Sequence, residues 1–182
     1  MKPALIVLFA ALVALTAASA SGAPATAISS RFTRIVESRC PEISQPGPAD
    51  EVGDELGKRC PGLGANAIWI YYFDSSRMRL GFGRRGNING MFGPERDEAW
   101  PFEWRGRVVA GRFTPFAVIA RVRPAGDPGP TTELAVWKLT ADGASCIIGH
   151  FGPGPRQNEQ ARAAADRALT GAACEAPPDL LD

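Results

Sequence analysis

The alternation of apolar and polar residues predicts that most of this chain forms β-strands. The longest apolar run after the N-terminal segment is Ala67 to Phe73, and both of its alternating faces are apolar, as in a strand buried on two sides. A Pro-Gly-x-Gly turn precedes this run. Asp-Ser-Ser follows it and leads into Arg77 to Gly83, where arginines alternate with apolar residues. The pattern therefore predicts a β-hairpin at the middle of a sheet.

Further segments show the same period of two. In Trp100 to Val109, Trp100, Phe102 and Trp104 fall on one side, and Pro101 indicates that this strand begins at a sheet edge. In the first segment, Arg31 to Cys40, the apolar residues also fit helical spacing, but Cys40-Pro41 ends the segment and favours a strand. The predicted strands are Arg31 to Cys40, Trp100 to Val109 and Pro115 to Arg123, followed by a hairpin of Thr132 to Leu139 with Ser145 to Phe151.

Two stretches are rich in loop residues, and one is helical. Glu42 to Arg59 combines prolines, glycines and acids and predicts a surface loop, while Asn89-Gly90 is a tight-turn pair. Asn158 to Thr170 has an alanine stripe at helical spacing, with Asn158 as the expected N-cap and Gly171 as the end. The expected fold is mainly β: a single antiparallel sheet, sandwich or barrel-like domain with one C-terminal helix.

The N-terminus has the pattern of a signal peptide. A basic residue precedes the apolar stretch Ala4 to Leu15, and Ala18-Ser19-Ala20 offers a small-x-small cleavage site before Ser21. We expect a periplasmic or secreted protein without a membrane anchor after cleavage. The predicted division is a signal peptide over 1–20, a flexible lead-in over 21–30, one domain over 31–174 and a disordered tail over 175–182.

Four cysteines lie beyond the cleavage site, and an even number in an exported chain indicates two disulfides. Three pairings are formally possible. The local ones, Cys40–Cys60 and Cys146–Cys174, are favoured, and each would contribute about 3 kcal/mol by restricting the unfolded chain. Zinc binding is disfavoured because there is no C-x-x-C pair and His150 is the one histidine. No cofactor or metal is expected.

Charge disfavours nucleic-acid binding. Removing residues 1–20 leaves equal numbers of cations and acids, yet Trp69 to Arg123 is locally rich in arginine. If these arginines share a solvent-facing sheet surface with nearby aromatics, they can bind an anionic envelope polymer or another envelope protein. The alternative is that the aromatics form the core and the arginines only coat the sheet. The candidate binding residues are Arg77, Arg79, Arg105, Arg107, Trp100 and Trp104.

Catalytic patterns are weak. Gly81 to Gly86 matches G-x-G-x-x-G, but Asn87 to Gly90 cannot begin the helix that a dinucleotide site requires. His150 has no nucleophile motif and no evident orienting partner, so it is expected to be a sheet residue beside a turn. The acids Glu95, Asp97, Glu98 and Glu103 can supply a carboxylate pair for glycan hydrolysis, or can be solvated loop charges.

A family resemblance covers most of the exported chain. It is carried by Cys40, Cys60-Pro61-Gly62, Trp69 to Phe73, Asp74 and Arg77, and by Asn158, Ala161-Arg162 and Ala165-Asp166 near the C-terminus. These features resemble a family of small secreted proteins found mostly in alphaproteobacteria. The resemblance implies an exported, disulfide-bonded, β-rich domain and implies no activity.

A periplasmic binding or interaction module is therefore the first hypothesis, with an envelope glycan or protein as the ligand. A lysozyme-inhibitor-like barrel is one version of it, by architecture only. The alternatives are a cell-wall or glycan hydrolase that uses Glu95 and Glu103, and a structural envelope protein. The enzyme question stays open, although binding is favoured over catalysis.

Overall fold

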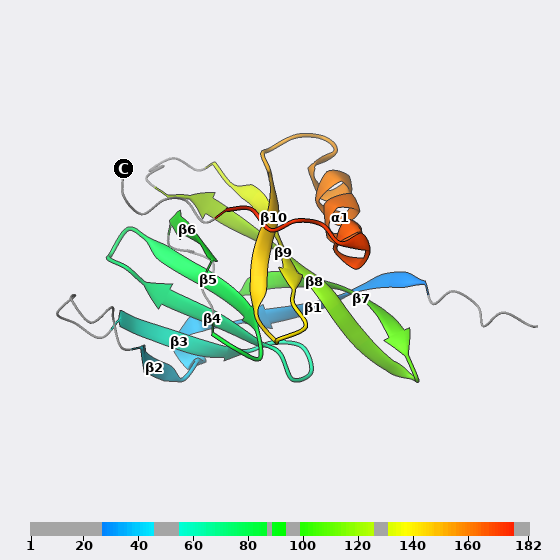
Figure 1. Cartoon of the computed structure of the whole chain (residues 1–182). Coiled ribbons are helices and arrows are strands. Elements are labelled where there is room, and N and C mark those ends of the chain that lie inside the picture. The colour runs from blue at the N-terminus through cyan, green and yellow to red at the C-terminus, as the bar shows by residue number, and fades with distance from the viewer. Residues whose placement is uncertain (1–26, 46–54, 87–88, 94–98, 126–130, 177–182) are drawn as a thin grey trace, which may run out of the picture.

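The computed structural model describes residues 27–45, 55–86, 89–93, 99–125 and 131–176. Within them, ten strands form one antiparallel sheet that curls into a half-barrel, with a single α-helix near the C-terminus (Figure 1). The strands are β1 (Ile28–Ile35), β2 (Glu42–Gln45), β3 (Glu55–Pro61), β4 (Ala67–Tyr72), β5 (Met78–Gly83), β6 (Asn89–Gly93), β7 (Trp100–Val109), β8 (Arg112–Pro124), β9 (Glu133–Leu139) and β10 (Ser145–Phe151). The helices are η1 (Glu37–Arg39), α1 (Gln157–Arg167) and η2 (Ala168–Thr170).

The long strand β8 explains why the sheet curls. The strand order is β1-β7-β8-β6-β5-β4-β3-β2, and β9 also pairs with β8 and carries β10. Residues 117–122 of β8 pair with β9, whereas Arg123 and Pro124 pair with β6. Two branches of the sheet thus start from successive parts of one strand. A hydrogen bond links the two branches, because the Phe82 amide of β5 donates to Ser145 Oγ of β10 at 2.9 Å. The branches close toward each other around a common interior.

The hairpin predicted over 67–83 is confirmed as β4 and β5. β4 lies between β3 and β5, so both its edges are paired. Ile68 and Ile70 point into the core and are fully buried, while Trp69 and Tyr71 lie on the outer face. The final hairpin is also confirmed, as β9 and β10.

Three local predictions are wrong. Both ends of the expected loop over 42–59 are strands, because β3 pairs with buried β4 and β2 pairs with β3, which offsets their weak strand propensity. Residues 46–54 lie outside the described residues. Asn89-Gly90 begins β6 instead of forming a turn, and Gly90 sits at a register shift with φ +75°. β7 is not an edge strand, since it lies between β1 and β8. On the β8 side, its register starts only after Pro101, at Phe102.

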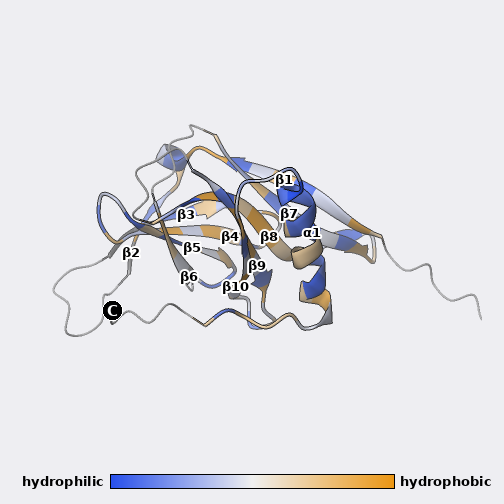
Figure 2. Ribbon diagram, turned by 90° about the horizontal axis from the view of Figure 1, so that it is seen from above, coloured by the Kyte–Doolittle hydropathy of each residue, from blue (hydrophilic) through white to orange (hydrophobic). Residues whose placement is uncertain are grey.

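Aromatic side chains fill the inner side of the half-barrel. Phe82 packs edge-on against Trp137 with ring centroids 4.8 Å apart, and the Phe82 ring also contacts Trp104 and Phe102. The indole N–H groups of Trp104 and Trp100 donate to Thr33 Oγ1 and to the Arg121 carbonyl. Figure 2 shows the corresponding hydrophobic stretches along the central strands, in contrast to the largely hydrophilic helix.

The outer side of the sheet has a second, smaller core beneath α1. Ala161, Ala164 and Ala165 of the helix are buried against an apolar patch made by Ala117, Ile119, Leu134 and Val136. Small residues let the helix lie close to the strands. The helix begins after Arg156, so Asn158 is not its N-cap, and Gly171 ends η2 with φ +91°, as the sequence predicts.

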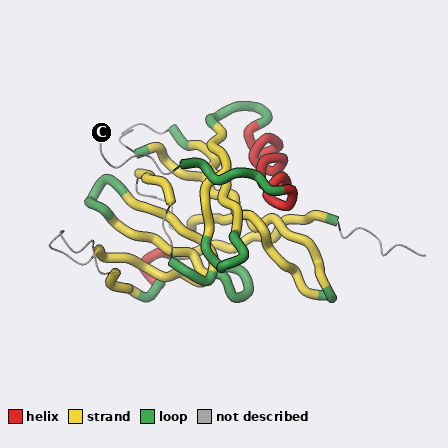
Figure 3. Tube along the Cα trace, viewed as in Figure 1, coloured by secondary structure: helices red, strands yellow, loops and turns green. Residues whose placement is uncertain are grey.

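Both predicted disulfides are confirmed, Cys40–Cys60 and Cys146–Cys174. Two disulfides indicate an oxidising, extracytoplasmic environment. The second bridge ties the segment after the helix to β10, and Figure 3 shows that segment running back across the strand as a loop. Among the described helices, none is long and apolar enough to cross a bilayer.

Candidate functional site

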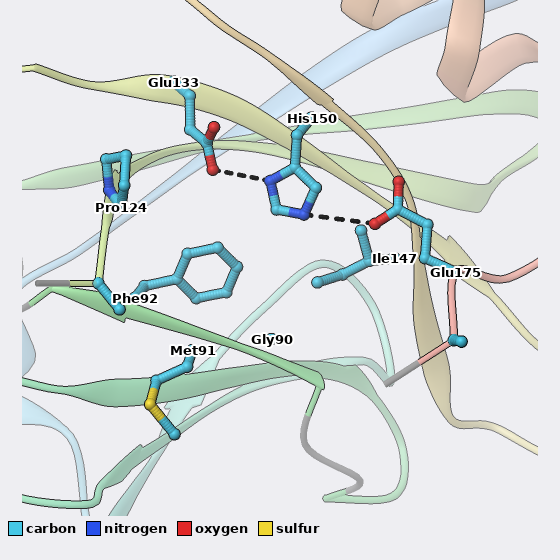
Figure 4. Close-up of a pocket in the computed structure, with 10 residues that line it drawn as sticks. Gly90, Met91, Phe92, Pro124, Glu133, Ile147, His150 and Glu175 are labelled. Atoms are coloured by element: carbon cyan, nitrogen blue, oxygen red, sulfur yellow. Dashed lines mark hydrogen bonds and ion pairs between the residues drawn. The ribbon is translucent and has the colours of Figure 1, made fainter. Parts of the chain in front are cut away.

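A half-open pocket of about 480 Å³ lies where β6, the end of β8, the start of β9, β10 and the C-terminal segment meet (Figure 4). It is at one end of the half-barrel interior, beyond the aromatic core. Glu175 and Ala176, which the sequence assigned to the tail, are part of its lining. The predicted signal peptide, most of the lead-in and most of the tail, residues 1–26 and 177–182, lie outside the described chain. The end of the predicted lead-in belongs to β1, which starts at Ile28.

The floor of the pocket is apolar and is built by a close approach of β6 to β10. Gly90 is the extra residue at the β5–β6 register shift, and a Cβ there would lie 2.5 Å from Ile147 Cδ1. Only glycine therefore fits at this crossing, where φ is also positive. Phe92 follows, with its ring 5.6 Å from the Trp137 ring and only 1% of its surface exposed. The floor is thus an extension of the main core.

The wall that borders this floor carries the titratable groups. His150 Nδ1 lies 2.7 Å from Glu133 Oε1, and Nε2 lies 3.5 Å from Glu175 Oε2. Figure 4 shows the imidazole ring between the two carboxylates, above the Phe92 ring. The centroids of the imidazole and Phe92 rings are 6.1 Å apart. An imidazole flanked by two acids thus borders an apolar floor.

A β-bulge in β10 turns His150 toward the pocket. Residues three apart in a regular strand face opposite sides of the sheet, but the register shifts between Ile147 and Gly149. Ile147 and His150 consequently share the inner face. His150 is opposite Ala135 of β9, and Glu133 lies two residues before Ala135 on the same face, which makes it a diagonal neighbour of the imidazole.

Glu175 reaches the pocket by a different route. The Cys146–Cys174 disulfide holds the C-terminal segment beside β10, and the Glu175 amide donates to the Ile147 carbonyl at 2.8 Å. Among the described residues, its carboxylate has no closer polar partner than His150 Nε2. Glu175 is thus held by its backbone, while its carboxylate keeps unused acceptor capacity.

The expectation that His150 has no orienting partner is wrong, because Glu133 lies beside it. A neutral imidazole has one N–H, and donation from Nδ1 to Glu133 leaves Nε2 as an acceptor facing a second acceptor, the Glu175 carboxylate. A hydrogen bond on that side requires one more proton, on His150 or on Glu175. The wall therefore has more acceptors than donors.

The reactive side chains among the described lining residues of the pocket are Glu133, His150 and Glu175. No serine, threonine, cysteine, lysine or arginine is in that set. The acids contact opposite nitrogens of one ring, and within the described chain no three His, Cys, Asp or Glu side chains converge on a possible metal position.

The residues proposed from sequence do not form one surface. Trp100 and Trp104 are 2% and 0% exposed, so they belong to the core and offer no face for stacking. Arg105 makes a bidentate pair with Asp166 of α1, at 2.9 and 2.7 Å, and its side chain is only 12% exposed. The expected common patch with Arg77 and Arg79 is therefore wrong, because the helix covers the β7 half of the outer face. Arg107 lies near the end of β7, opposite Ile28 and Thr114.

Arg77 and Arg79 instead form an arginine–aromatic face with Phe73, Trp69 and Arg59. The guanidinium carbons of Arg77 and Arg79 lie 4.5 and 5.3 Å from the Phe73 ring centroid, and Arg59 lies 5.2 Å from that of Trp69. Hydrogen bonds from Arg77 and Ser76 lower the pKa of Asp74 to about 2. This face lies on the outer side of β3, β4 and β5.

Of the carboxylates considered for hydrolysis, Glu103 is the one that lies in the described residues. Glu103 accepts a bidentate pair from Arg162 at 2.8 and 3.1 Å and a hydrogen bond from Ser30 Oγ. These contacts occupy its oxygens in holding β1 and α1. Glu95, Asp97 and Glu98 lie outside the described residues.

The chain matches no protein-family model, no curated protein and no solved structure. Its fold and its pocket are therefore interpreted from their own geometry.

Proposed function

We propose that this protein is an exported binding module, and that the pocket at His150 holds a small ligand with an apolar body. The observation that carries the proposal is the pocket itself: apolar side chains at Phe92 and Ile147 border a polar wall at Glu133, His150 and Glu175. An apolar lining with a few convergent polar groups is the usual character of small-molecule sites, and about 300–1,000 Å³ is their usual volume.

The rest of the half-barrel supports this choice of site. Its interior is filled by packed aromatic rings, among them Phe82, Trp104 and Trp137, so a ligand cannot enter along the barrel axis. The end of the interior beside β6 and β10 is open on one side and retains polar groups. The disulfides and the signal-like N-terminus support a periplasmic or secreted location.

Filling the pocket tests the proposal. Ala125 is an exposed lining residue, and Ala125→Trp would place an indole at the pocket mouth. The matched control is Ala141→Trp, on the exposed turn at the far end of β9 and β10. The probes are octan-1-ol, octylammonium and octanoate, and saturation-transfer NMR detects whether each one binds. At least one should bind the native protein and the control and lose its signal with Ala125→Trp. If no probe binds, or if Ala125→Trp binds as the native chain does, the pocket is not a ligand site.

A second candidate function is attachment to an anionic envelope polymer through the arginine–aromatic face. It is favoured by the position of Arg77 and Arg79 over Phe73, which is 43% exposed. The double variant Arg77→Ser with Arg79→Ser should elute from a heparin column at lower salt than the native protein. Arg107→Ser with Arg112→Ser removes equal charge elsewhere and should elute later than that variant. Equal elution of the two variants would mean that only net charge matters.

A further inference from the structure

We infer that the ligand of the His150 pocket carries a cation, an ammonium or guanidinium on an apolar stem, which binds at the Glu133 and Glu175 carboxylates. The inference rests on the proposed function and names the chemical class of its ligand. The apolar stem would lie against Phe92 and Ile147, and the cation would reach the carboxylates beside them.

The charge of the lining favours a cation. Glu133 and Glu175 are its two acids, His150 is the one basic side chain among its described residues, and lysine and arginine are absent from that set. Even a protonated imidazole leaves a net negative charge. An anionic head would face two carboxylates in a partly enclosed site, where like charges repel more strongly than in water.

The hydrogen-bonding capacity of the wall gives an independent reason. Glu133 receives the Nδ1–H of His150, but the Glu175 carboxylate is 3.5 Å from Nε2 and has no closer polar partner in the described chain. The pocket therefore lacks donors, and not acceptors. An ammonium brings three donors and a guanidinium brings five, and neither brings an acceptor. A cation thus supplies what the wall lacks.

A sugar fits less well. Sugar rings usually stack on an exposed aromatic face, but Phe92, the aromatic ring among the described lining residues besides the imidazole, is only 1% exposed. The rest of the floor is aliphatic, formed by Ile147, Pro124 and the stem of Met91. An alkyl stem can pack there without a stacking partner.

The experiment compares three head groups on one stem. Isothermal titration of the native protein with octylammonium, octan-1-ol and octanoate at low ionic strength should give the tightest binding for octylammonium. We expect it to bind about tenfold more tightly than octan-1-ol, which corresponds to one charge-assisted hydrogen bond. Octanoate should bind more weakly than either. Added sodium chloride should weaken octylammonium binding and leave octan-1-ol binding nearly unchanged.

Two variants test whether the preference for octylammonium arises at Glu175. Glu175→Gln keeps the shape of an exposed side chain and should remove most of the preference for octylammonium over octan-1-ol. Glu159→Gln makes the same change of charge at an exposed position in the first turn of α1, away from the pocket, and should keep the preference. Circular dichroism checks that both variants are folded.

The outcomes separate the inference from the function on which it rests. If octan-1-ol or octanoate binds as tightly as octylammonium, the pocket binds a ligand without selecting a cation, and the inference is wrong. If both variants keep the preference for octylammonium, the cation is not held at Glu175, and the inference is wrong as well. If no probe binds at all, the proposed function fails and the inference fails with it.

Discussion

The outer face of the sheet has two halves that look alike in sequence and differ in structure. At the start of β5, where Arg77 precedes the strand and Arg79 lies in it, and along β7, arginines alternate with large apolar residues that point into the core. On the β7 half, α1 covers the strands and Arg105 is held by Asp166. On the β5 half, no described element lies over Arg77 and Arg79, and they lie over a partly exposed Phe73.

The difference shows what alternation does and does not predict. It identifies the residues that leave the inner core, because side chains of a strand alternate between faces. It does not say whether another element covers the outer face. Here the neighbouring strands decide: β8 and β9 present Ala117, Ile119 and Val136 outward, an apolar surface that the alanines of α1 bury. The same pattern of arginines therefore gives an ion-pair clamp in one half and an exposed face in the other.

The largest expected loss of stability comes from disrupting the packing of α1 on the outer face of the sheet. Ala164 is buried under α1, whereas its neighbour Ala163 is exposed. Ala164→Glu places a carboxylate against the outer core without a partner and should lower the free energy of unfolding by about 3 kcal/mol or more. Ala163→Glu should change it by less than about 0.5 kcal/mol. Urea denaturation measures both, and equal effects would mean that α1 does not pack as described.

The next effect compares the two arginine environments directly. Arg105→Ser leaves Asp166 without its bidentate partner in a half-buried setting and should cost about 1–3 kcal/mol. Arg77→Ser removes an exposed pair with Asp74 and should cost less than about 1 kcal/mol. Chemical denaturation should rank the variants in that order. A reversed ranking would show that the β5 half, and not the helix clamp, holds the sheet.

A smaller effect is expected when the exposed half loses both of its arginines. Arg77→Ser with Arg79→Ser removes two cation–π contacts to Phe73, each worth about 0.5–1 kcal/mol at an exposed site. The variant should remain folded at 25 °C, with a modest fall in the melting temperature. Its unfolding would mean that these side chains are structural and would remove the basis for a polymer-binding face.

The smallest expected effect is a change in stability at low pH caused by protonation of Asp74. The pKa of Asp74 falls from its ordinary value of 3.8 to about 2 in the folded state, chiefly through the Arg77 and Ser76 hydrogen bonds. A depressed carboxyl pKa stabilises the folded state fully above about pH 4, and this contribution is lost as the pH falls toward 2. Asp74→Asn should therefore melt slightly below the native chain at pH 6, and the gap should close by pH 2. A gap that is constant with pH would contradict this.

Local patterns were sufficient for several elements. The β4–β5 hairpin, the β9–β10 hairpin, the helix end at Gly171 and both disulfides follow from alternation, turn residues and short spacings. β2 and β3 could not be predicted in the same way. Their composition is that of a loop. β3 is a strand because it pairs with the edge of buried β4, and β2 in turn pairs with β3.

The pocket was missed because its groups are far apart in sequence. Glu133 and Glu175 reach His150 through strand register and a disulfide, and neither creates a local motif. A signal was nevertheless present. The predicted β9–β10 hairpin already places Glu133 near His150, and the favoured Cys146–Cys174 pair already places Glu175 beside β10. The bulge that turns His150 inward has no comparable signature in the sequence.

The Cys146–Cys174 bridge also makes part of the pocket dependent on oxidation. Two hydrogen bonds hold the segment that carries Glu175, from Lys138 Nζ to the Ala172 carbonyl and from the Glu175 amide to Ile147. At about 1 kcal/mol each, they do not offset the roughly 1–2 kcal/mol per residue needed to order that segment. The covalent bond adds to these contacts in holding the segment beside β10. Reduction of this bond is therefore expected to release Glu175 from the pocket while Glu133 and His150 stay on their strands.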